Sequence, residues 1–170
     1  MLIYLIRHAI AVEREPSGLS SDRARPLTSK GIQKMQRIAR ALRRLGVSPG
    51  EIWSSPFVRA RQTAEILSEN LETMPAVALV DSLIPGDPAD TVIVELRSSQ
   101  QRLESIALVG HQPDLGELAG KLLGTPRGTT LQIKKGGVVC IRIADLQPPL
   151  TGELCWMATP KILSLISPSP

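Results

Sequence analysis

Short apolar runs alternate with amphipathic segments along most of the chain. Continuous apolar runs at residues 2–6 and 105–109 are typical of strands that are buried on both faces. Residues 29–45 and 56–71 instead carry apolar side chains at helical spacing, and Gly46 ends the first of these segments. The pattern therefore predicts buried strands that alternate with helices packed on them.

Turn and capping residues set the boundaries of these elements. Thr28 can cap the helix over 29–45, and the pair Ser55-Pro56 suits the N-cap and first turn of the helix over 56–71. We expect the tail after about residue 160, which ends in SPSP, to be loose. The other predicted elements are strands at 51–54, 76–80, 137–143 and 152–158 (the last at a sheet edge), a helix from the turn at 85–88 to about 98, and a helix from Pro113 to near Gly124.

This alternation of strand and helix predicts an α/β fold. We expect one domain over residues 1–170, with three α/β/α layers and a mostly parallel central sheet flanked by helices. Ligands of such sheets bind at the carboxyl ends of the strands. That edge is where candidate chemistry should be sought.

Composition narrows the functional classes. The chain has 170 residues, of which 42% are apolar and 21% charged, as in a soluble globular protein. No apolar run approaches the roughly 18–20 residues of a membrane span, and the N-terminus MLIYLIRH lacks the pattern of a signal peptide. We expect a cytoplasmic protein with no membrane partner. Cys140 and Cys155 are expected to be buried thiols, and two histidines in all argue against a metal cluster, so neither a metal nor another cofactor is expected.

Positive charge is concentrated in the first third of the chain. Residues 1–61 hold twelve Lys and Arg against four acids, a net of +8, whereas the whole chain has a net charge of +4. Such a segment can be a solvated helix face, an anion site or a nucleic-acid surface. With one Phe, one Tyr and two Trp, the chain has little surface for stacking on bases, so a nucleic-acid partner is not expected.

Candidate chemistry follows two of the apolar runs. His8 ends the first run and His111 follows the run at 105–109, so both emerge at one sheet edge if these strands are parallel neighbours. Taken alone, each histidine can also be interpreted as a structural residue with no part in chemistry. Arg7 precedes His8, and Arg59 and Arg61 lie in the first turns of a helix, where a bound anion would suit both the arginine and the helix N-terminus. Two histidines and at least two arginines on one rim predict a phosphoryl-transfer site, with a histidine nucleophile and arginine donors for phosphate oxygens.

Three segments together resemble a known family. LIRHAIAVE is similar to the Arg-His-Gly motif of the histidine phosphatase superfamily, which has the phosphoglycerate-mutase-like fold. SSPFVRARQTAEIL resembles its second motif, and VGHQP its later Gly-His element. The short length, the segment ARPLTSKG and the turn PGDP are similar to SixA-type phosphohistidine phosphatases.

The resemblance implies specific roles. It makes His8 a nucleophile that is transiently phosphorylated, with Arg7, Arg59 and His111 on the phosphate and Arg61 outside the pocket. Arg25, in the RPLT segment, resembles a further phosphate-facing arginine that binds substrate. The implied partner is a phosphorylated protein that carries phosphohistidine.

Two departures from the family pattern stand out. Ala9 replaces the usual Gly after His8, which could tighten that turn. Larger members carry an acid after the third strand, and here that region offers only Asp81, Asp87 and Asp90, without a convincing acid motif. The missing acid fits a phosphoramidate substrate, because an imidazole nitrogen leaves with less proton assistance than an alkoxide.

Three hypotheses remain open on the sequence alone. The first is a metal-independent phosphohistidine phosphatase acting on a protein. The second is a phosphatase for a small phosphoester, with Asp81, Asp87 or Asp90 as the acid. The third is a non-enzymatic module that binds phosphate or nucleic acid. The oligomeric state is not predicted.

Overall fold

A computed structural model describes residues 1–13, 21–100, 102–126 and 131–167. Two short 3-10 turns, η1 (Asp22–Ala24) and η2 (Asp81–Leu83), join the regular elements. The strands and helices in chain order are β1 (Leu2–Arg7), α1 (Ser29–Arg44), β2 (Glu51–Ser54), α2 (Val58–Asn70), β3 (Ala76–Leu79), α3 (Ala89–Ser99), β4 (Ser105–Gly110), α4 (Asp114–Leu122), β5 (Val138–Arg142), β6 (Glu153–Ala158) and α5 (Pro160–Ile166).

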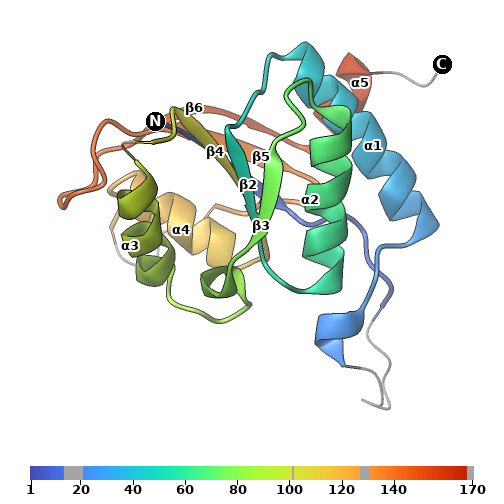
Figure 1. Cartoon of the computed structure of the whole chain (residues 1–170), viewed down its shortest axis with the longest axis horizontal. Helices are drawn as coiled ribbons and strands as arrows, with labels where there is room; N and C mark the ends of the chain where they lie inside the picture. The colour runs from blue at the N-terminus through green and yellow to red at the C-terminus, as the bar shows by residue number, and fades with distance from the viewer. Residues whose placement is uncertain (14–20, 101, 127–130, 168–170) are drawn as a thin grey trace.

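The strands form one six-stranded sheet with the order β3-β2-β4-β1-β5-β6 (Figure 1). The first four strands in this order run parallel, and β5 and β6 join antiparallel at one side. The predicted α/β fold with a mostly parallel sheet is therefore confirmed, as is the edge position of β6. The two longest apolar runs, β1 and β4, are parallel neighbours at the centre of the sheet.

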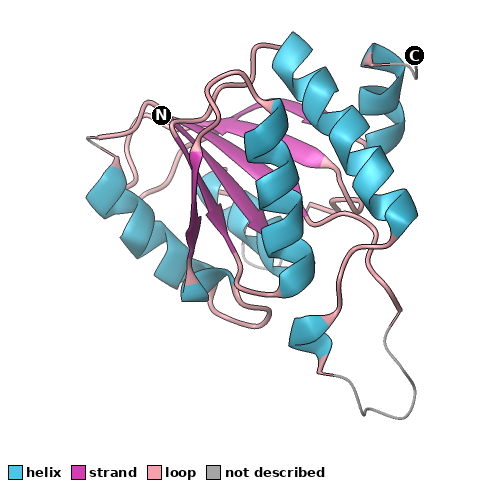
Figure 2. Ribbon diagram, turned by 45° about the vertical axis from the view of Figure 1, so that its right-hand side comes forward, coloured by secondary structure: helices cyan, strands magenta, loops and turns pink. Residues whose placement is uncertain are grey.

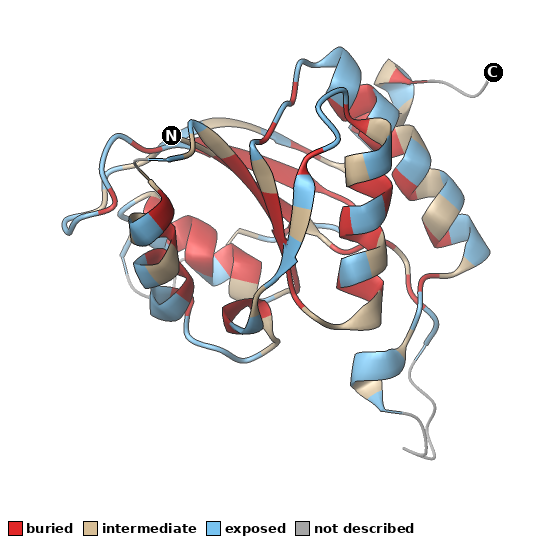
Figure 3. Cartoon of the chain, viewed as in Figure 1, coloured by how far each residue is buried: buried red, intermediate tan, exposed pale blue. Residues whose placement is uncertain are grey.

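Helices cover both faces of the sheet, as Figures 1 and 2 show. Alternate residues of β1 point into opposite cores: Tyr4 and Ile6 pack with α1, α2 and α5, whereas Ile3 and Leu5 pack with α3 and α4. Figure 3 shows the buried strands between these two layers. This double burial explains why the central strands read as continuous apolar runs.

The start of α1 is tied to the chain that follows β1. Thr28 caps the helix by accepting a hydrogen bond from the backbone N–H of Gly31, as predicted. The backbone N–H of Thr28 donates to the carbonyl of Ile10 across 3.0 Å. Gly31 lies so close to that carbonyl that a Cβ atom there would collide with it. The helix N-terminus is thereby held next to the segment that carries His8.

The predicted start of the second helix is wrong by two residues. The helix α2 begins at Val58, with Phe57 at the N-cap, and Ser55 does not cap it. The Ser55 hydroxyl has another use, because it bonds to the ring of His111. A polar contact across the sheet edge has therefore replaced the local cap that the sequence favoured.

The prediction of a loose tail after about residue 160 is also wrong, because most of this segment forms a helix. Pro160–Ile166 form α5, which Thr159 caps through its side chain, and Leu163 of this helix is fully buried. The Arg44 guanidinium donates to the carbonyl of Ile166 across 2.8 Å, so α1 holds the end of α5. The residues 168–170 lie outside the described part of the chain.

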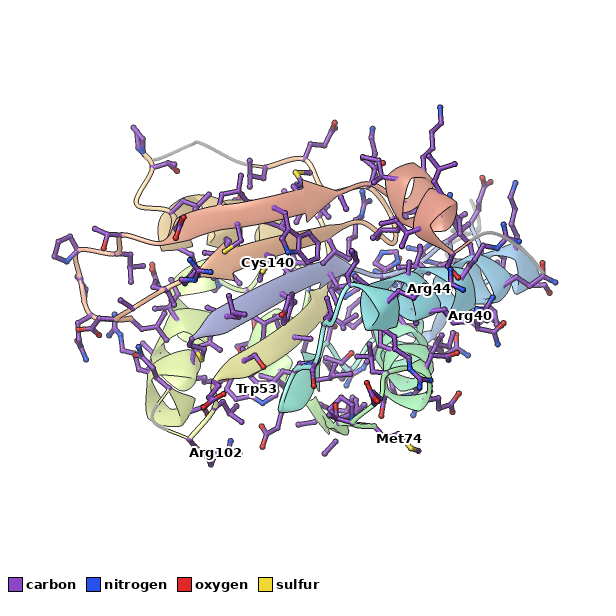
Figure 4. The ribbon with its side chains drawn as sticks, turned by 90° about the horizontal axis from the view of Figure 1, so that it is seen from above. Arg40, Arg44, Trp53, Met74, Arg102 and Cys140 are labelled. Atoms are coloured by element: carbon purple, nitrogen blue, oxygen red, sulfur yellow. The ribbon has the colours of Figure 1, made fainter. Side chains whose placement is uncertain are left out.

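The cysteines lie on the two antiparallel strands. Cys140 on β5 is buried, as expected, but Cys155 on the edge strand β6 is only half-buried. Figure 4 labels Cys140 within the sheet, and Arg40 and Arg44 on α1. In the described residues, no helix has both the length and the apolar character needed to cross a membrane.

Candidate active site

The two histidines of the chain meet at the carboxyl edge of the sheet. Arg7 and Gly110 are paired in register at the ends of β1 and β4, and His8 and His111 are the residues that directly follow these strands. Their ring centroids lie 5.1 Å apart, and both side chains are buried. The register of two parallel strands therefore places the two imidazoles side by side.

His8 is held as a neutral imidazole with a defined tautomer. Its Nδ1 lies 2.7 Å from the carbonyl of Ala9, which can only accept, so Nδ1 carries the proton. Its Nε2 lone pair then accepts a hydrogen bond from Nε of Arg59 across 3.3 Å. Burial lowers the pKa of His8 to about 4; the bond to Ala9 opposes this shift, and the charges of Arg59 and Arg7 reinforce it. At neutral pH, Nε2 therefore keeps the lone pair that a nucleophile needs.

Arg59 is a buried cation whose every nitrogen has a partner. It lies in the first turn of α2 and is only 4% exposed. While Nε faces His8, Nη1 donates to the backbone carbonyl of Asp22 (2.7 Å) and Nη2 to its carboxylate (3.0 Å). The guanidinium also lies over the ring of Phe57, at 5.0 Å from its centroid. These contacts fix the direction of the guanidinium, which is the property required of a phosphate ligand.

His111 is oriented by a serine from the neighbouring strand end. Its Nε2 lies 2.9 Å from Oγ of Ser55, and the hydroxyl can either donate to this ring nitrogen or accept from it, according to the tautomer of His111. The Nδ1 of His111 is buried and has no hydrogen-bond partner among the described residues, and it carries the ring proton when the Ser55 hydroxyl donates to Nε2. Burial lowers the pKa of His111 to about 3, with the neighbouring charges of His8 and Arg59 adding to the effect.

Arg7 reaches the site from the last position of β1. Its Nη1 donates to the carbonyl of Ile133 across 2.9 Å, and its Nε is buried without a protein partner among the described residues. Burial lowers its pKa, but a guanidinium remains charged at neutral pH. An anion beside His8 would satisfy both the charge and the unused N–H.

Arg25 lies one step further from the histidines. Its Nε donates to the carboxylate of Asp22 (2.8 Å) and its Nη1 to the carbonyl of Val12 (2.7 Å). It therefore reaches the site through Asp22, which it shares with Arg59. Arg61 points away: it is exposed and pairs with Glu65 at 3.6 Å.

The candidate acids lie at the rim or outside it. Asp87 is exposed and lines a cleft together with His111, Ser82 and Asp114. Asp81 is exposed at the start of η2 and does not line that cleft. Asp90 pairs with Lys121 on the surface.

Ala9 fits its position without strain. Among the described residues other than glycine, Met74 alone has a positive φ, so the backbone at Ala9 does not require a glycine. The Ala9 side chain is buried, and its N–H donates to Oγ1 of Thr63 across 3.1 Å. The turn after His8 therefore accommodates the methyl group of Ala9 without the tightening that we expected.

Several residues of the site were missed in the sequence. Asp22 holds both arginines, Ser55 orients His111, and Thr63 links the chain after His8 to α2 by accepting from Ala9 and donating to the carbonyl of Arg59. Ser55 had a detectable signal, because it follows β2 at the same sheet edge as the two histidines. Asp22 had none, since it lies in a loop that no periodicity places.

Comparison with known proteins identifies the family. The model of the histidine phosphatase superfamily (branch 1) matches residues 3–83. An uncharacterized protein of Picosynechococcus sp. is 36% identical over 166 residues, which cover 96% of this chain and 99% of that protein. The chain belongs to the histidine phosphatase superfamily. A phosphohistidine phosphatase SixA from Escherichia coli K12 is 27% identical over 123 residues, 72% of this chain and 74% of that one.

Solved structures of this superfamily share the fold over nearly the whole chain. The protein histidine phosphatase SixA, solved in complex with tungstate, superposes with a TM-score of 0.82 at 23% identity, covering 95% of this chain and 98% of that one. A structure of a putative alpha-ribazole-5'-P phosphatase from Escherichia coli gives a TM-score of 0.75 at 22% identity, covering 95% and 98%. These structures show the phosphoglycerate-mutase-like fold, and membership of the superfamily supports phosphatase activity.

The site places the His8 imidazole beside several nitrogen groups of neighbouring side chains. Arg59 donates to the Nε2 lone pair of His8, whereas Nε of Arg7 and Nδ1 of His111 are buried without a hydrogen-bond partner among the described residues. In the described part of the chain, no three His, Cys, Asp or Glu side chains gather where a metal ion could be held.

Proposed function

We propose that this enzyme removes phosphate from phosphohistidine on a protein, through a covalent phosphohistidine at His8 and without a metal. One observation carries the proposal: Nε2 of His8 is unprotonated and faces Arg59 at 3.3 Å, with the His111 ring 5.1 Å away. The similarity to SixA proteins supports the choice of substrate. The proposed setting is the reducing cytoplasm, in which Cys140 and Cys155 stay free thiols.

The reaction would proceed in two displacements at phosphorus. In the first, Nε2 of His8 attacks in line the phosphorus of a phosphoimidazole that is protonated on its other ring nitrogen. The new N–P bond forms, and the N–P bond to the substrate breaks with its electron pair on the substrate nitrogen, so that a neutral imidazole leaves. In the second, water attacks the phosphorus of phospho-His8, releases inorganic phosphate and restores the His8 lone pair. Arg7, Arg59 and the Nδ1–H of His111 would hold the equatorial oxygens throughout both steps.

The leaving group decides whether a strong acid is needed. An imidazole nitrogen is a far better leaving group than an alkoxide, so its departure depends little on a general acid. The described residues place only Asp87 and Asp114 in the cleft beside His111. A phosphoramidate therefore suits this site better than a phosphoester.

The test is the loss of label from a protein phosphorylated on histidine with 32P. The wild-type enzyme should release the label, and His8→Ala should leave it in place. Arg61→Ala is the matched control, because Arg61 lies on the same helix as Arg59 but is exposed and paired with Glu65. Full activity of His8→Ala would overturn the mechanism, and loss of activity on addition of EDTA would overturn the metal-independent chemistry.

A second candidate is hydrolysis of a small phosphoester. Asp87 favours it, because this carboxyl lines the same cleft as His111 and could protonate an alkoxide. The structural likeness to a putative alpha-ribazole-5'-P phosphatase shows that the fold is shared with such enzymes. A higher rate on sugar phosphates than on phosphohistidine would favour the second candidate. The rate on sugar phosphates should then collapse in Asp87→Asn and survive in Asp81→Asn, which is the control.

A further inference from the structure

A basic groove runs from the active-site edge along α1 and α5. It consists of two adjoining hollows that share Lys34 and Lys161. Every charged residue that lines either hollow is a lysine or an arginine. The first hollow is lined by Arg7, Ile10, Lys34, Lys134, Lys135, Thr159, Pro160 and Lys161, and the second by Lys30, Gln33, Lys34, Arg37, Lys161, Ser164 and Leu165.

The groove results from the packing of two helices with no acids between them. The helix α1 carries six Lys and Arg and no Asp or Glu, and α5, which packs along it, has one lysine and no acid (Figures 1 and 2). Lys30, Lys34 and Arg37 recur at helical spacing, so they lie on one face of α1. None of these three forms an ion pair with a described residue.

Such a surface costs free energy in the isolated protein. Like charges on neighbouring turns of a helix repel one another, and Lys161 brings a further positive charge across from α5. A ligand with negative charges would relieve this repulsion. The basic groove is therefore better suited to a bound anion-rich surface than to water alone.

The groove is continuous with the catalytic centre. Arg7 lines its first hollow and directly precedes His8, and the charge of Lys135 is one of the influences that lower the pKa of His8. A molecule lying in the groove would therefore approach the nucleophile along the protein surface. This position suits the carrier of the phosphoryl group.

We propose that the basic groove docks an acidic surface of the protein that carries the phosphohistidine. This inference rests on the proposed function and specifies its partner: a protein with Asp and Glu side chains around the phosphorylated histidine. The groove also exposes apolar groups, among them Ile10 and Leu165, which suit the mixed surface of a protein. No aromatic side chain lines the groove, so it offers no stacking surface for the bases of a nucleic acid.

The experiment separates docking from chemistry by using two substrates. One is a 32P-phosphohistidine protein with an acidic surface around its histidine, and the other is phosphoimidazole, which is too small to reach along the groove. The test variant is Lys34→Glu/Lys161→Glu. The matched control is Arg40→Glu/Arg43→Glu, which makes the same change in the net charge of the protein. Both of its residues are exposed on α1 and line neither hollow.

For the phosphoprotein, the groove variant should lose on the order of tenfold or more in kcat/KM, and the salt dependence of kcat/KM should become shallower. For phosphoimidazole, both variants should match the wild-type enzyme, which also shows that they are folded. Equal phosphoprotein kinetics in the groove and control variants would overturn the docking proposal alone. If the wild-type enzyme hydrolyses neither substrate, the proposed function itself fails.

Binding gives a second, independent measurement. In the His8→Ala background, which cannot turn over the substrate by the proposed route, the groove variant should bind the phosphoprotein more weakly than the control variant does. Single-stranded or duplex DNA is offered to the same proteins at physiological salt. Binding of DNA that is tighter than that of the phosphoprotein, and is lost in the groove variant, would overturn an acidic protein as the occupant.

Discussion

Arg59 donates its Nε–H to Nε2 of His8, so a buried cation lies against the lone pair that would attack phosphorus. This hydrogen bond requires an unprotonated Nε2, and the positive charge of Arg59 disfavours protonation there. When a phosphoryl group approaches Nε2, the same N–H can donate its hydrogen bond to a phosphate oxygen instead of to His8. The pair thus couples the protonation state of the nucleophile to the group that would hold its target.

Arg59→Lys tests whether the guanidinium fork, rather than its charge, matters. Lysine keeps a positive charge, but it lacks the rigid fork by which Arg59 donates from Nε to His8 and from Nη2 to the carboxylate of Asp22. Loss of one such donor typically lowers kcat by about 10²–10³-fold, and we expect a decrease in that range. The measurement is single-turnover release of phosphate, with Arg61→Lys as the control. Near-normal turnover in Arg59→Lys would show that charge alone suffices.

The two histidines should titrate far below the usual range. Burial lowers the pKa of His8 to about 4 and that of His111 to about 3, so neither ring should protonate between pH 8 and pH 5. Because the chain has only two histidines, carbon-13 labelling of histidine gives two resolved ring signals, which His8→Ala assigns. A midpoint near 6.5 for either signal in the folded protein would contradict the buried, neutral pair.

The same shifts predict how stability depends on pH. An unfolded histidine binds its proton near pH 6.5, whereas the folded His8 and His111 bind theirs only near 4 and 3, so the unfolded state takes up more protons between these values. The contribution of the neutral pair is complete above about pH 6.5 and is lost as the pH falls toward the folded values. The urea midpoint should therefore decrease from pH 7 to pH 4.5, and His111→Asn should reduce that dependence.

The sequence predicted the fold and the location of the histidines because both depend on local patterns. The buried strands β1 and β4 have continuous apolar runs, and a residue that directly follows a parallel strand lies at the carboxyl edge of the sheet. The contacts that complete the site could not be predicted in this way. Asp22 meets Arg59 across 37 residues of chain, and Ser55 meets His111 across 56, so no periodicity relates them.

The helix α5 shows a different kind of limit. Pro160–Ile166 is too short for its apolar pattern to be distinguished from a loose tail, although Thr159 and Pro160 form a good helix start. When α5 is not predicted, the positively charged residues of α1 are interpreted as a helix face exposed to solvent. Only the packing of α5 along α1 turns that charge into one side of a groove.

Asp22 is expected to compete with phosphate for the arginines. Its carboxylate takes bonds from both Arg59 and Arg25, and these bonds outweigh its partial burial and leave its pKa below the ordinary value. In Asp22→Asn, the negative charge is removed while the size of the side chain is kept. We expect inorganic phosphate to inhibit this variant at several-fold lower concentration than the wild-type enzyme. Asp90→Asn is the surface control, and an unchanged or higher inhibition constant in Asp22→Asn would count against competition.

Ser55→Ala should disturb catalysis through the tautomer of His111. The Ser55 hydroxyl is the group that bonds to Nε2 of His111, and we propose that it donates to Nε2, which places the ring proton on Nδ1. Without the hydroxyl, the ring can move its proton to Nε2, and the Nδ1–H donor to phosphate would be lost. We expect kcat to fall about tenfold, in line with the usual cost of removing a group that orients a histidine.

Two further observations distinguish this effect from damage to the fold. The nitrogen-15 signals of His111 should shift toward the Nε2–H tautomer in Ser55→Ala, and Ser55→Thr, which keeps the hydroxyl, should restore both the signals and the rate. The helix α2 should be unaffected, because its N-cap is Phe57 and the Ser55 hydroxyl makes only a long bond of 3.4 Å to the N–H of that residue. If Ser55→Ala lowers the thermal midpoint but leaves kcat and the His111 signals unchanged, Ser55 acts on the stability of the turn and has no part in orienting the imidazole.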